Sequence, residues 1–257
     1  TFLTHFGQTS EPSDASDYDR ITDVVTDDST GAIYLFGYTG NLISASQGYN
    51  DMFVIKLNSD GSYAWGTQIG SSSSDYCWAG AIDSSGNVYC AGYTYGDFDE
   101  SNAGGADVFV TKLSPDGSVL WKTHLGTNTG VNSNASSQYI RGMDVDSSGN
   151  VYAGGRTYGD FGSYEGTAET NAGGSDVFVL KLDNNGNLQW VSQLGNTATS
   201  VSSEIYDASN YEYLRDIKVG TSGQIYVGGY TSGSFGETNG GGYDVFTVAF
   251  DSSGSVQ

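Results

Sequence analysis

Short apolar runs of about five to eight residues alternate along the chain with turns rich in glycine, asparagine, aspartate and serine. No stretch shows sustained helical periodicity, so the pattern predicts strands and hairpins throughout. One strand-like phrase, a leading aspartate with a phenylalanine two residues later, occurs four times. Its copies begin 56, 69 and 68 residues apart, at Asp51, Asp107, Asp176 and Asp244. A period of this size is typical of a repeat architecture.

The text around this phrase repeats as well. Upstream of each copy stands a Gly-x-Thr, which ends at Thr39, Thr94, Thr157 and Thr231. Fourteen residues after the aspartate, three copies carry a tryptophan, namely Trp65, Trp121 and Trp190. Each repeat therefore holds four predicted strands, which is the content of one propeller blade. We expect the three tryptophans to be structural and to hold matching positions on the outer strands.

The predicted fold is an all-β propeller of four four-stranded blades, in a single domain spanning residues 1–257. The repeats are expected at 18–70, 75–126, 138–195 and 211–257, with residues 1–7 completing the last one. The segment 2–7 matches 121–126 position for position, so the first strand can pair with the last and close the ring without exposed edges. Two alternatives stay open: a piece of a longer repeat array, or a terminal strand that pairs with a neighbouring subunit.

Several phrases resemble the bacterial beta-propeller repeat family called SBBP. They are Asp-Ser-Ser-Gly-Asn-Val-Tyr, Gly-Tyr-Thr, Gly-Asp-Phe, Gly-Gly-x-Asp-Val-Phe-Val-x-Lys-Leu and Gly-Ser-Val-Leu-Trp with a trailing Leu-Gly. The resemblance covers nearly the whole chain. It implies a propeller, usually in exported or surface proteins, and offers no shared catalytic residues. Four copies is fewer than the seven blades for which the family is often named.

The composition favours an extracellular or cell-surface setting. Thirty acidic residues against nine basic ones give a net charge of −21, which repels nucleic acid and anionic lipid and suits divalent cations. No apolar run in the sequence is long enough to span a membrane, and the sequence contains no signal-peptide pattern. Both cysteines, Cys77 and Cys90, match apolar positions in the other repeats. We expect them to lie on opposite faces of their sheet, without a disulfide, unless a bulge shifts the register.

A second repeated phrase is a candidate for Ca²⁺. In three repeats a glutamate, an asparagine and an aspartate recur at fixed spacing in a glycine-rich loop, and such hard oxygen donors are what calcium prefers. The residues are Glu100, Asn102 and Asp107; Glu169, Asn171 and Asp176; and Glu237, Asn239 and Asp244. The alternative is a solvated loop in which asparagine and aspartate make turn hydrogen bonds.

Arginine is concentrated near the expected propeller axis. Of four arginines, three begin a first strand, and a tryptophan holds the corresponding place in the second repeat; the residues are Arg20, Arg141, Arg215 and Trp78. First strands line the central channel of a propeller, so these residues are predicted to ring one mouth of it and to hold an anionic ligand or a partner's carboxylate. The alternative pairs the arginines with Asp23, Asp144 and Asp216, since charge near a core must be paired.

No catalytic set stands out. His5 and His124 occupy the same repeat position, and no nucleophile, zinc or phosphate-loop motif is present. We therefore predict a non-enzymatic surface module that contacts proteins or glycans. One alternative is a carbohydrate-active enzyme that uses carboxylates. Another is a calcium-stabilised subunit of a filament, surface layer or virion, joined through terminal strands.

Overall fold

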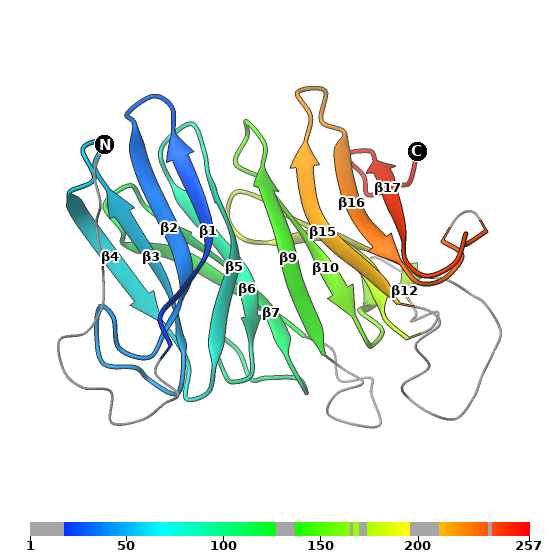
Figure 1. Cartoon of the computed structure of the whole chain (residues 1–257), viewed down its shortest axis with the longest axis horizontal. Coiled ribbons are helices and arrows are strands. Elements are labelled where there is room, and N and C mark those ends of the chain that lie inside the picture. Colours follow the sequence, from blue (N-terminus) through cyan, green and yellow to red (C-terminus); the bar gives the residue numbers. More distant parts are fainter. Residues whose placement is uncertain (1–17, 127–136, 165–166, 170–173, 196–210, 236–237) are drawn as a thin grey trace. The chain divides into compact units, whose positions relative to one another are not determined.

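A computed structural model describes residues 18–126, 137–164, 167–169, 174–195, 211–235 and 238–257. These residues form antiparallel strands joined by turns and loops (Figure 1). The strands are β1 (Arg20–Asp27), β2 (Ala32–Thr39), β3 (Asp51–Leu57), β4 (Tyr63–Ile69), β5 (Asp75–Ile82), β6 (Val88–Thr94), β7 (Asp107–Leu113), β8 (Val119–Leu125), β9 (Gln138–Val145), β10 (Val151–Thr157), β11 (Gly162–Tyr164), β12 (Thr167–Glu169), β13 (Asp176–Leu182), β14 (Leu188–Leu194), β15 (Glu212–Val219), β16 (Ile225–Thr231) and β17 (Asp244–Phe250). Within the described part, no helix has the length and apolar character to cross a membrane.

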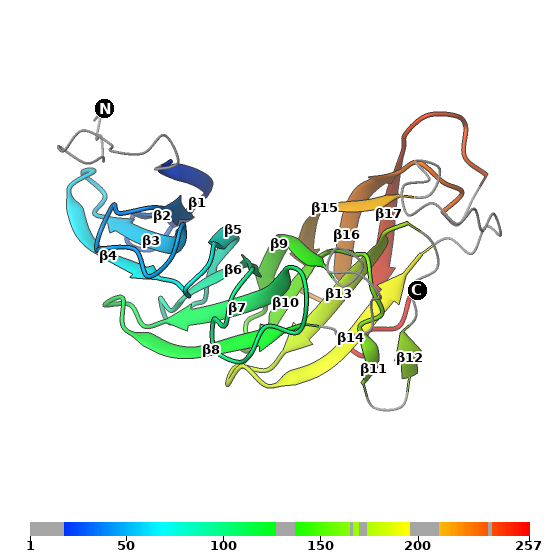
Figure 2. The same ribbon diagram turned by 90° about the horizontal axis from the view of Figure 1, so that it is seen from below.

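The strands assemble into blade-like sheets in sequence order. Three sheets have four strands, in the orders β1-β2-β3-β4, β5-β6-β7-β8 and β9-β10-β13-β14, and a fourth has the order β15-β16-β17. A separate hairpin pairs β11 with β12 (Figure 2). The predicted all-β fold with four-stranded repeats is thereby confirmed. The segment 2–7, predicted as the outer strand beside β17, lies outside the described residues, so ring closure and blade number stay predictions.

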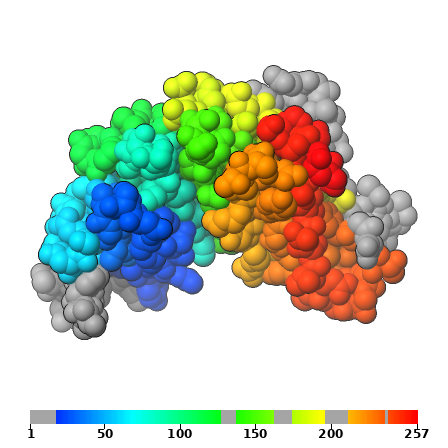
Figure 3. Space-filling model, turned by 90° about the horizontal axis from the view of Figure 1, so that it is seen from above, coloured from blue at the N-terminus to red at the C-terminus, as the bar shows by residue number. Residues whose placement is uncertain are grey.

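By contact density the chain divides into two compact units. Unit 1 contains the sheets β1–β4 and β5–β8; unit 2 contains β9 to β17 and the short stretch Ala103–Asp107, which includes the first residue of β7. Each unit has an apolar core formed where its sheets pack face to face. In unit 1 the core includes Phe36, Val54 and Phe109, and in unit 2 it includes Val179 and Phe250. The residues of β15–β17, orange to red, form one continuous surface in Figure 3.

Each of the four first strands carries a β-bulge at the same repeat position. The extra residue is Thr22 in β1, Trp78 in β5, Arg141 in β9 and Arg215 in β15. The glycine of each Gly-x-Thr lies opposite the bulge: a Cβ on Gly92 would lie 1.8 Å from the carbonyl oxygen of Tyr76. The repeated glycine therefore permits a close backbone approach.

The bulge overturns the prediction for the cysteines. Cys90 lies opposite Gly80, as expected, but the extra residue moves Cys77 from Tyr93 to Gly92. A shift of one residue turns a side chain to the other face of a sheet. Both cysteines consequently face the same side, fully buried, and form a disulfide with their Cα atoms 6.0 Å apart.

The outer-strand tryptophans join neighbouring sheets within each unit. Trp65 on β4 donates its indole N–H to the Pro115 carbonyl at 2.9 Å and packs on Gly117. Trp190 on β14 makes the corresponding bond, at 3.1 Å, to the Ser252 carbonyl. Gly117 has φ of 87°, which L side chains rarely adopt, so the turn that receives the indole needs glycine. Trp65, Trp121 and Trp190 all stand on outer strands, as predicted.

Candidate functional site

The predicted axis residues lie among aromatic side chains in both units. Trp78, Arg141 and Arg215 are the extra residues of bulges, which re-aim side chains at a strand end. The guanidinium of Arg20, at the start of β1, lies 5.8 Å from the centre of the Trp78 ring. These two residues lie side by side, and their place at the mouth of a central channel stays a prediction. Arg215 belongs to a second group of residues in unit 2.

The unit 1 cluster consists of side chains from β1, β2, β5 and β6 and the residue after β6: Arg20, Tyr38, Tyr76, Trp78, Tyr93 and Tyr95. At its centre is Tyr93, whose ring stacks on Trp78 with planes 14° apart and a centroid distance of 6.2 Å. The Tyr76 ring lies 5.2 Å from the Tyr93 ring. Tyr93 itself is nearly buried, while Tyr95 is 43% exposed. The cluster thus presents aromatic surface at one end of the inner strands.

The unit 2 cluster is built in the same way on β9, β10, β15 and β16 and on residues that directly follow β10 or precede β15 and β17. Its members are Tyr139, Arg156, Tyr158, Tyr211, Tyr213, Arg215, Tyr230 and Tyr243. Arg156 holds the position that Tyr93 has in unit 1. Its guanidinium carbon lies 5.1 Å from the Tyr139 ring, 5.3 Å from Tyr158 and 4.8 Å from Tyr213. Distances under 6 Å to a ring face are attractive for a cation.

Arg156 was missed from the sequence because only first strands were considered for the axis. The signal was present: Tyr38, Tyr93 and Tyr230 hold the middle position of their Gly-x-Thr, and the third repeat has arginine there. Arg215 donates to the Tyr230 hydroxyl at 3.1 Å, so both arginines of this cluster are held by tyrosine. Arg141 lies on β9 and is partly buried.

The alternative pairing of arginine with aspartate is wrong. Asp23 accepts the backbone N–H of Gly80, and Asp144 accepts that of Val219, each from the neighbouring sheet of its unit. Asp216 accepts the N–H of Ile217. These carboxylates brace the backbone, and none forms an ion pair with arginine in the described part of the chain.

Two tyrosine hydroxyls in the unit 2 cluster, those of Tyr158 and Tyr213, stay protonated at neutral pH. Burial raises the pKa of Tyr158 and of Tyr213, and the positive charge of Arg156 offsets part of that rise. A protonated phenol both donates and accepts hydrogen bonds. The cluster therefore combines ring faces, hydroxyls and guanidinium groups.

The aspartates of the candidate calcium loops make turn hydrogen bonds. Asp107 accepts the N–H of Ala103 at 2.6 Å, and Asp244 accepts that of Gly240 at 2.6 Å. Asp51 accepts the N–H of Gln47 at 3.2 Å, although its loop has no glutamate. A shared bond across loops with and without glutamate supports the turn role.

The other candidate ligands do not complete a metal site where they are described. Asn239 accepts the N–H of Gly241, and Asp176 accepts from the Gln193 amide. The Asn102 N–H donates to Asp97, and Glu100 is exposed. Asn171, Glu237 and the Glu169 side chain lie outside the described residues. No group of three His, Cys, Asp or Glu suited to a metal occurs in the described part, and calcium binding at the loops stays a prediction.

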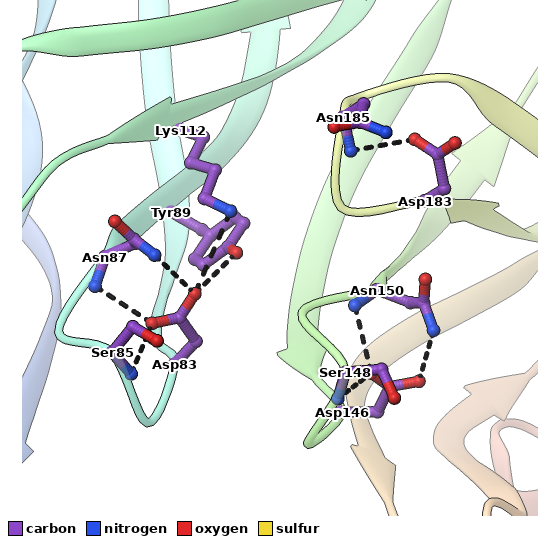
Figure 4. A network of polar contacts seen from close by, with 10 residues as sticks. All are labelled: Asp83, Ser85, Asn87, Tyr89, Lys112, Asp146, Ser148, Asn150, Asp183 and Asn185. Atoms are coloured by element: carbon purple, nitrogen blue, oxygen red, sulfur yellow. Dashed lines mark hydrogen bonds and ion pairs between the residues drawn. The ribbon is translucent and has the colours of Figure 1, made fainter.

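The Asp-Ser-Ser-Gly-Asn turns are closed by their own side chains (Figure 4). Asp83 accepts the N–H groups of Ser85 and Asn87 on one oxygen, and the Asn87 amide and Tyr89 hydroxyl on the other. Burial disfavours its charge, yet hydrogen bonds from Asn87 and Tyr89 lower the pKa of Asp83. Asp146 repeats the arrangement. Hydrogen bonds within each turn account for the position of its carboxylate, as expected for a tight hairpin.

Each unit contains one buried pair of carboxyl groups, located where two of its sheets meet. The sequence did not reveal these pairs. In unit 1, burial raises the pKa of Asp75 to about 6, with the charge of Asp51 adding to the effect. In unit 2, burial raises the pKa of Glu212 to about 7, and the charge of Asp176 adds again. All four residues are at most 1% exposed. These carboxyl groups lie in the contacts between sheets and are not accessible to solvent.

Comparisons with known proteins give one family match and several distant structural likenesses. No curated protein matches the chain. Among solved structures, a Staphylococcus aureus phage tail fiber matches with 10% identity and a TM-score of 0.28 over 98% of this chain, which spans 52% of the tail-fiber chain. A luciferin-regenerating enzyme matches with 14% identity and a TM-score of 0.26, covering 89% of this chain and 92% of that one. The WD40 domain of Neurospora crassa Pan2 matches with 10% identity and a TM-score of 0.26, covering 84% and 78%.

Likeness at these TM-scores is too slight to identify a fold or a function. The family model is more informative, because it matches the repeated text itself. Residues 64–99 and 120–162 match the SBBP beta-propeller repeat, which confirms over those segments the family that the sequence resembles.

Proposed function

We propose that this protein is a non-enzymatic β-propeller module of the cell surface or extracellular space that binds glycans through its two aromatic clusters. One observation carries the proposal: in each unit, rings from two neighbouring sheets gather at the ends of the inner strands. Aromatic faces carry partial negative charge, and they attract the C–H groups on the faces of a sugar ring. Arginine and tyrosine add hydrogen-bond donors for hydroxyls.

An extracellular setting is supported by the disulfide and the surface charge. Disulfides form and persist in oxidising compartments, and Cys77 is joined to Cys90 in unit 1. The net charge of −21 keeps nucleic acid and anionic lipid away. Neither is an expected partner.

A non-enzymatic role is supported by where the perturbed carboxyls lie. Carboxylate-based glycosidases need two accessible carboxyl groups on either side of the scissile bond. Asp75 and Glu212, whose pKa values are raised, are both completely buried. A glycosidase among the described residues would need other acids.

Assembly into a filament, surface layer or virion is a second candidate, favoured by β17. This strand lies at the edge of its sheet in the described part of the chain, and Val245 on it is 89% exposed. An exposed edge strand is a template for pairing with another strand. Mass measurement in solution tests this role: a concentration-dependent oligomer supports it, and a monomer at all concentrations contradicts it.

A glycan array with the full chain, followed by calorimetry on the hits, tests glycan binding. We expect binding that Tyr76→Ala and Tyr213→Ala together reduce by about tenfold or more. Tyr226→Ala is the matched control, because Tyr226 is 46% exposed but belongs to neither cluster. Equal loss in the control variant, or no bound glycan, would contradict the proposal.

A further inference from the structure

One substitution separates the two aromatic clusters. The central position is tyrosine in unit 1 and arginine in unit 2, and the surrounding rings keep their relation to it. Tyr93 pairs across the strands with Tyr76, and Arg156 pairs in the same register with Tyr139. The backbone slot is therefore the same in both units. The difference is that the Tyr93 ring of unit 1 is replaced in unit 2 by the positively charged Arg156, which is surrounded by aromatic rings.

The charge of Arg156 is not neutralised by the described part of the protein. The chain has 30 acidic residues and nine basic ones, yet Arg156 makes no ion pair among the described residues, and its buried Nε has no hydrogen-bond partner there. In the described part of the chain, its guanidinium lies against three tyrosine rings. Ring faces attract a cation but take up none of its five N–H donors. Those donors fit a carboxylate, which guanidinium binds through two parallel hydrogen bonds.

We propose that the unit 2 cluster selects acidic glycans: Arg156 binds the carboxylate of a uronic acid, and the surrounding tyrosines pack on the sugar ring. This specificity rests on the proposed glycan-binding function and deepens it for one of the two clusters. The second guanidinium of the site, on Arg215, is exposed and held by Tyr230. The unit 1 cluster, with Tyr93 in the central slot, is expected not to discriminate by charge.

A sugar acid fits this surface better than an acidic peptide does. Four tyrosine rings form a row, Tyr211, Tyr213, Tyr230 and Tyr243, in which successive ring centroids are 4.8 to 5.9 Å apart. A fifth ring, that of Tyr139, lies beside Arg156. A continuous aromatic surface suits flat rings that present C–H faces. Glutamate and aspartate side chains present a carboxylate without such a face.

The experiment compares two ligands with the same sugar chain, one with charged carboxylates and one with neutral methyl esters. A short oligogalacturonate and its fully methyl-esterified form are titrated into the full chain by calorimetry, in 0.15 M salt, where a Debye length of about 8 Å screens the acidic surface. A short oligomannuronate and a polyglutamate peptide are titrated alongside. Arg156→Tyr is the test variant, because tyrosine holds this slot in the other three repeats and the variant should fold. Lys218→Gln is the matched control, because it removes one positive charge from unit 2 at an exposed position outside both clusters.

We expect a uronate to bind at least about tenfold more tightly than the ester. Arg156→Tyr should abolish that difference, and Lys218→Gln should keep it. Equal binding of uronate and ester would overturn the acidic selectivity while leaving glycan binding intact. Failure of both uronates to bind would also overturn it, and the glycan array then decides the broader function separately. Polyglutamate that binds as tightly as uronate would assign the site to protein carboxylates instead. Equal loss in Lys218→Gln would show that the charge effect does not belong to this cluster.

Discussion

Units 1 and 2 pack their sheets together with the same backbone features but differ in the side chains at matching positions. Both join two sheets through a tryptophan on an outer strand, and both place a bulge on each first strand. Beyond that frame they diverge. Unit 1 has a disulfide where unit 2 has only apolar side chains at the matching positions. A ring fills the central slot of one cluster and a guanidinium fills the other. Positions that the backbone geometry requires thus carry the same residue in both units. Positions without such a requirement carry different residues.

The glycine opposite the bulge is a fixed position, so its loss should have the largest effect. A Cβ on Gly229 would lie 2.1 Å from the Tyr213 carbonyl oxygen, whereas nothing lies within 4 Å of one on Gly228. We expect Gly229→Ala to destabilise the protein by about 3 kcal/mol or more, because backbone must move. Gly228→Ala should change stability by less than about 1 kcal/mol. Urea denaturation measures both, and similar losses would show that the bulge does not require glycine.

The disulfide tests how far unit 1 depends on a feature that unit 2 lacks. The double variant Cys77→Ile and Cys90→Ala installs the residues that the third repeat has at these positions. Removing a bridge that closes a loop of about 13 residues should cost about 3 kcal/mol. Because the replacements suit the slot, packing should be kept, and the loss should appear in thermal unfolding as a lower transition for unit 1. An unchanged melting profile would mean that apolar packing alone holds this sheet.

Much of the strand arrangement could be predicted from the sequence. Where the predicted register was wrong, the cause was a single β-bulge. The repeated Asp-x-Phe phrase and the spacing of Trp65 located the strands, because both are local patterns. The register inside a blade was misjudged at Trp78, although the glycine in the middle of a strand was a sign of the bulge. That single residue reversed the face of Cys77 and made the disulfide prediction wrong.

Side chains that meet across sheets were beyond the reach of repeat spacing. Arg156 belongs to a second strand, and only the structure shows that it lies over Tyr213 of the next sheet. The same holds for Glu212 and Asp176, which begin strands of neighbouring sheets. Local patterns indicate which face a residue occupies, but tertiary packing decides what it meets there.

Because of the buried carboxyl pairs, the stability of the two units should depend on pH over different ranges. A carboxyl whose folded pKa is raised stabilises the protein fully below its unfolded pKa, and that stability is lost as pH rises through the folded value. For Asp75 the loss runs from about 4 to about 6, and for Glu212 from about 4.5 to about 7. Each contribution is on the order of 3 kcal/mol. Stability curves at fixed pH steps should therefore keep falling between pH 6 and 7 in Asp75→Asn, and flatten there in Glu212→Gln. Identical pH profiles for the two variants would contradict the assignment.

The smallest expected effect separates the turn and calcium roles of the loops. Asp244 accepts the Gly240 N–H, and an asparagine oxygen can accept the same bond. Under the turn role, Asp244→Asn should lower the free energy of unfolding by about 1 kcal/mol or less. The loss should be the same with calcium and with chelator. The melting temperature of the unchanged chain should then also be insensitive to calcium. Under the calcium role, the ion binds the folded state and raises the melting temperature, and Asp244→Asn abolishes that rise. Asp51 is the natural reference, because its loop lacks the glutamate yet makes the same N–H bond to Gln47. A calcium-dependent rise that survives Asp51→Asn but not Asp244→Asn would establish metal binding in the loops of unit 2 and add a chemical difference between the units.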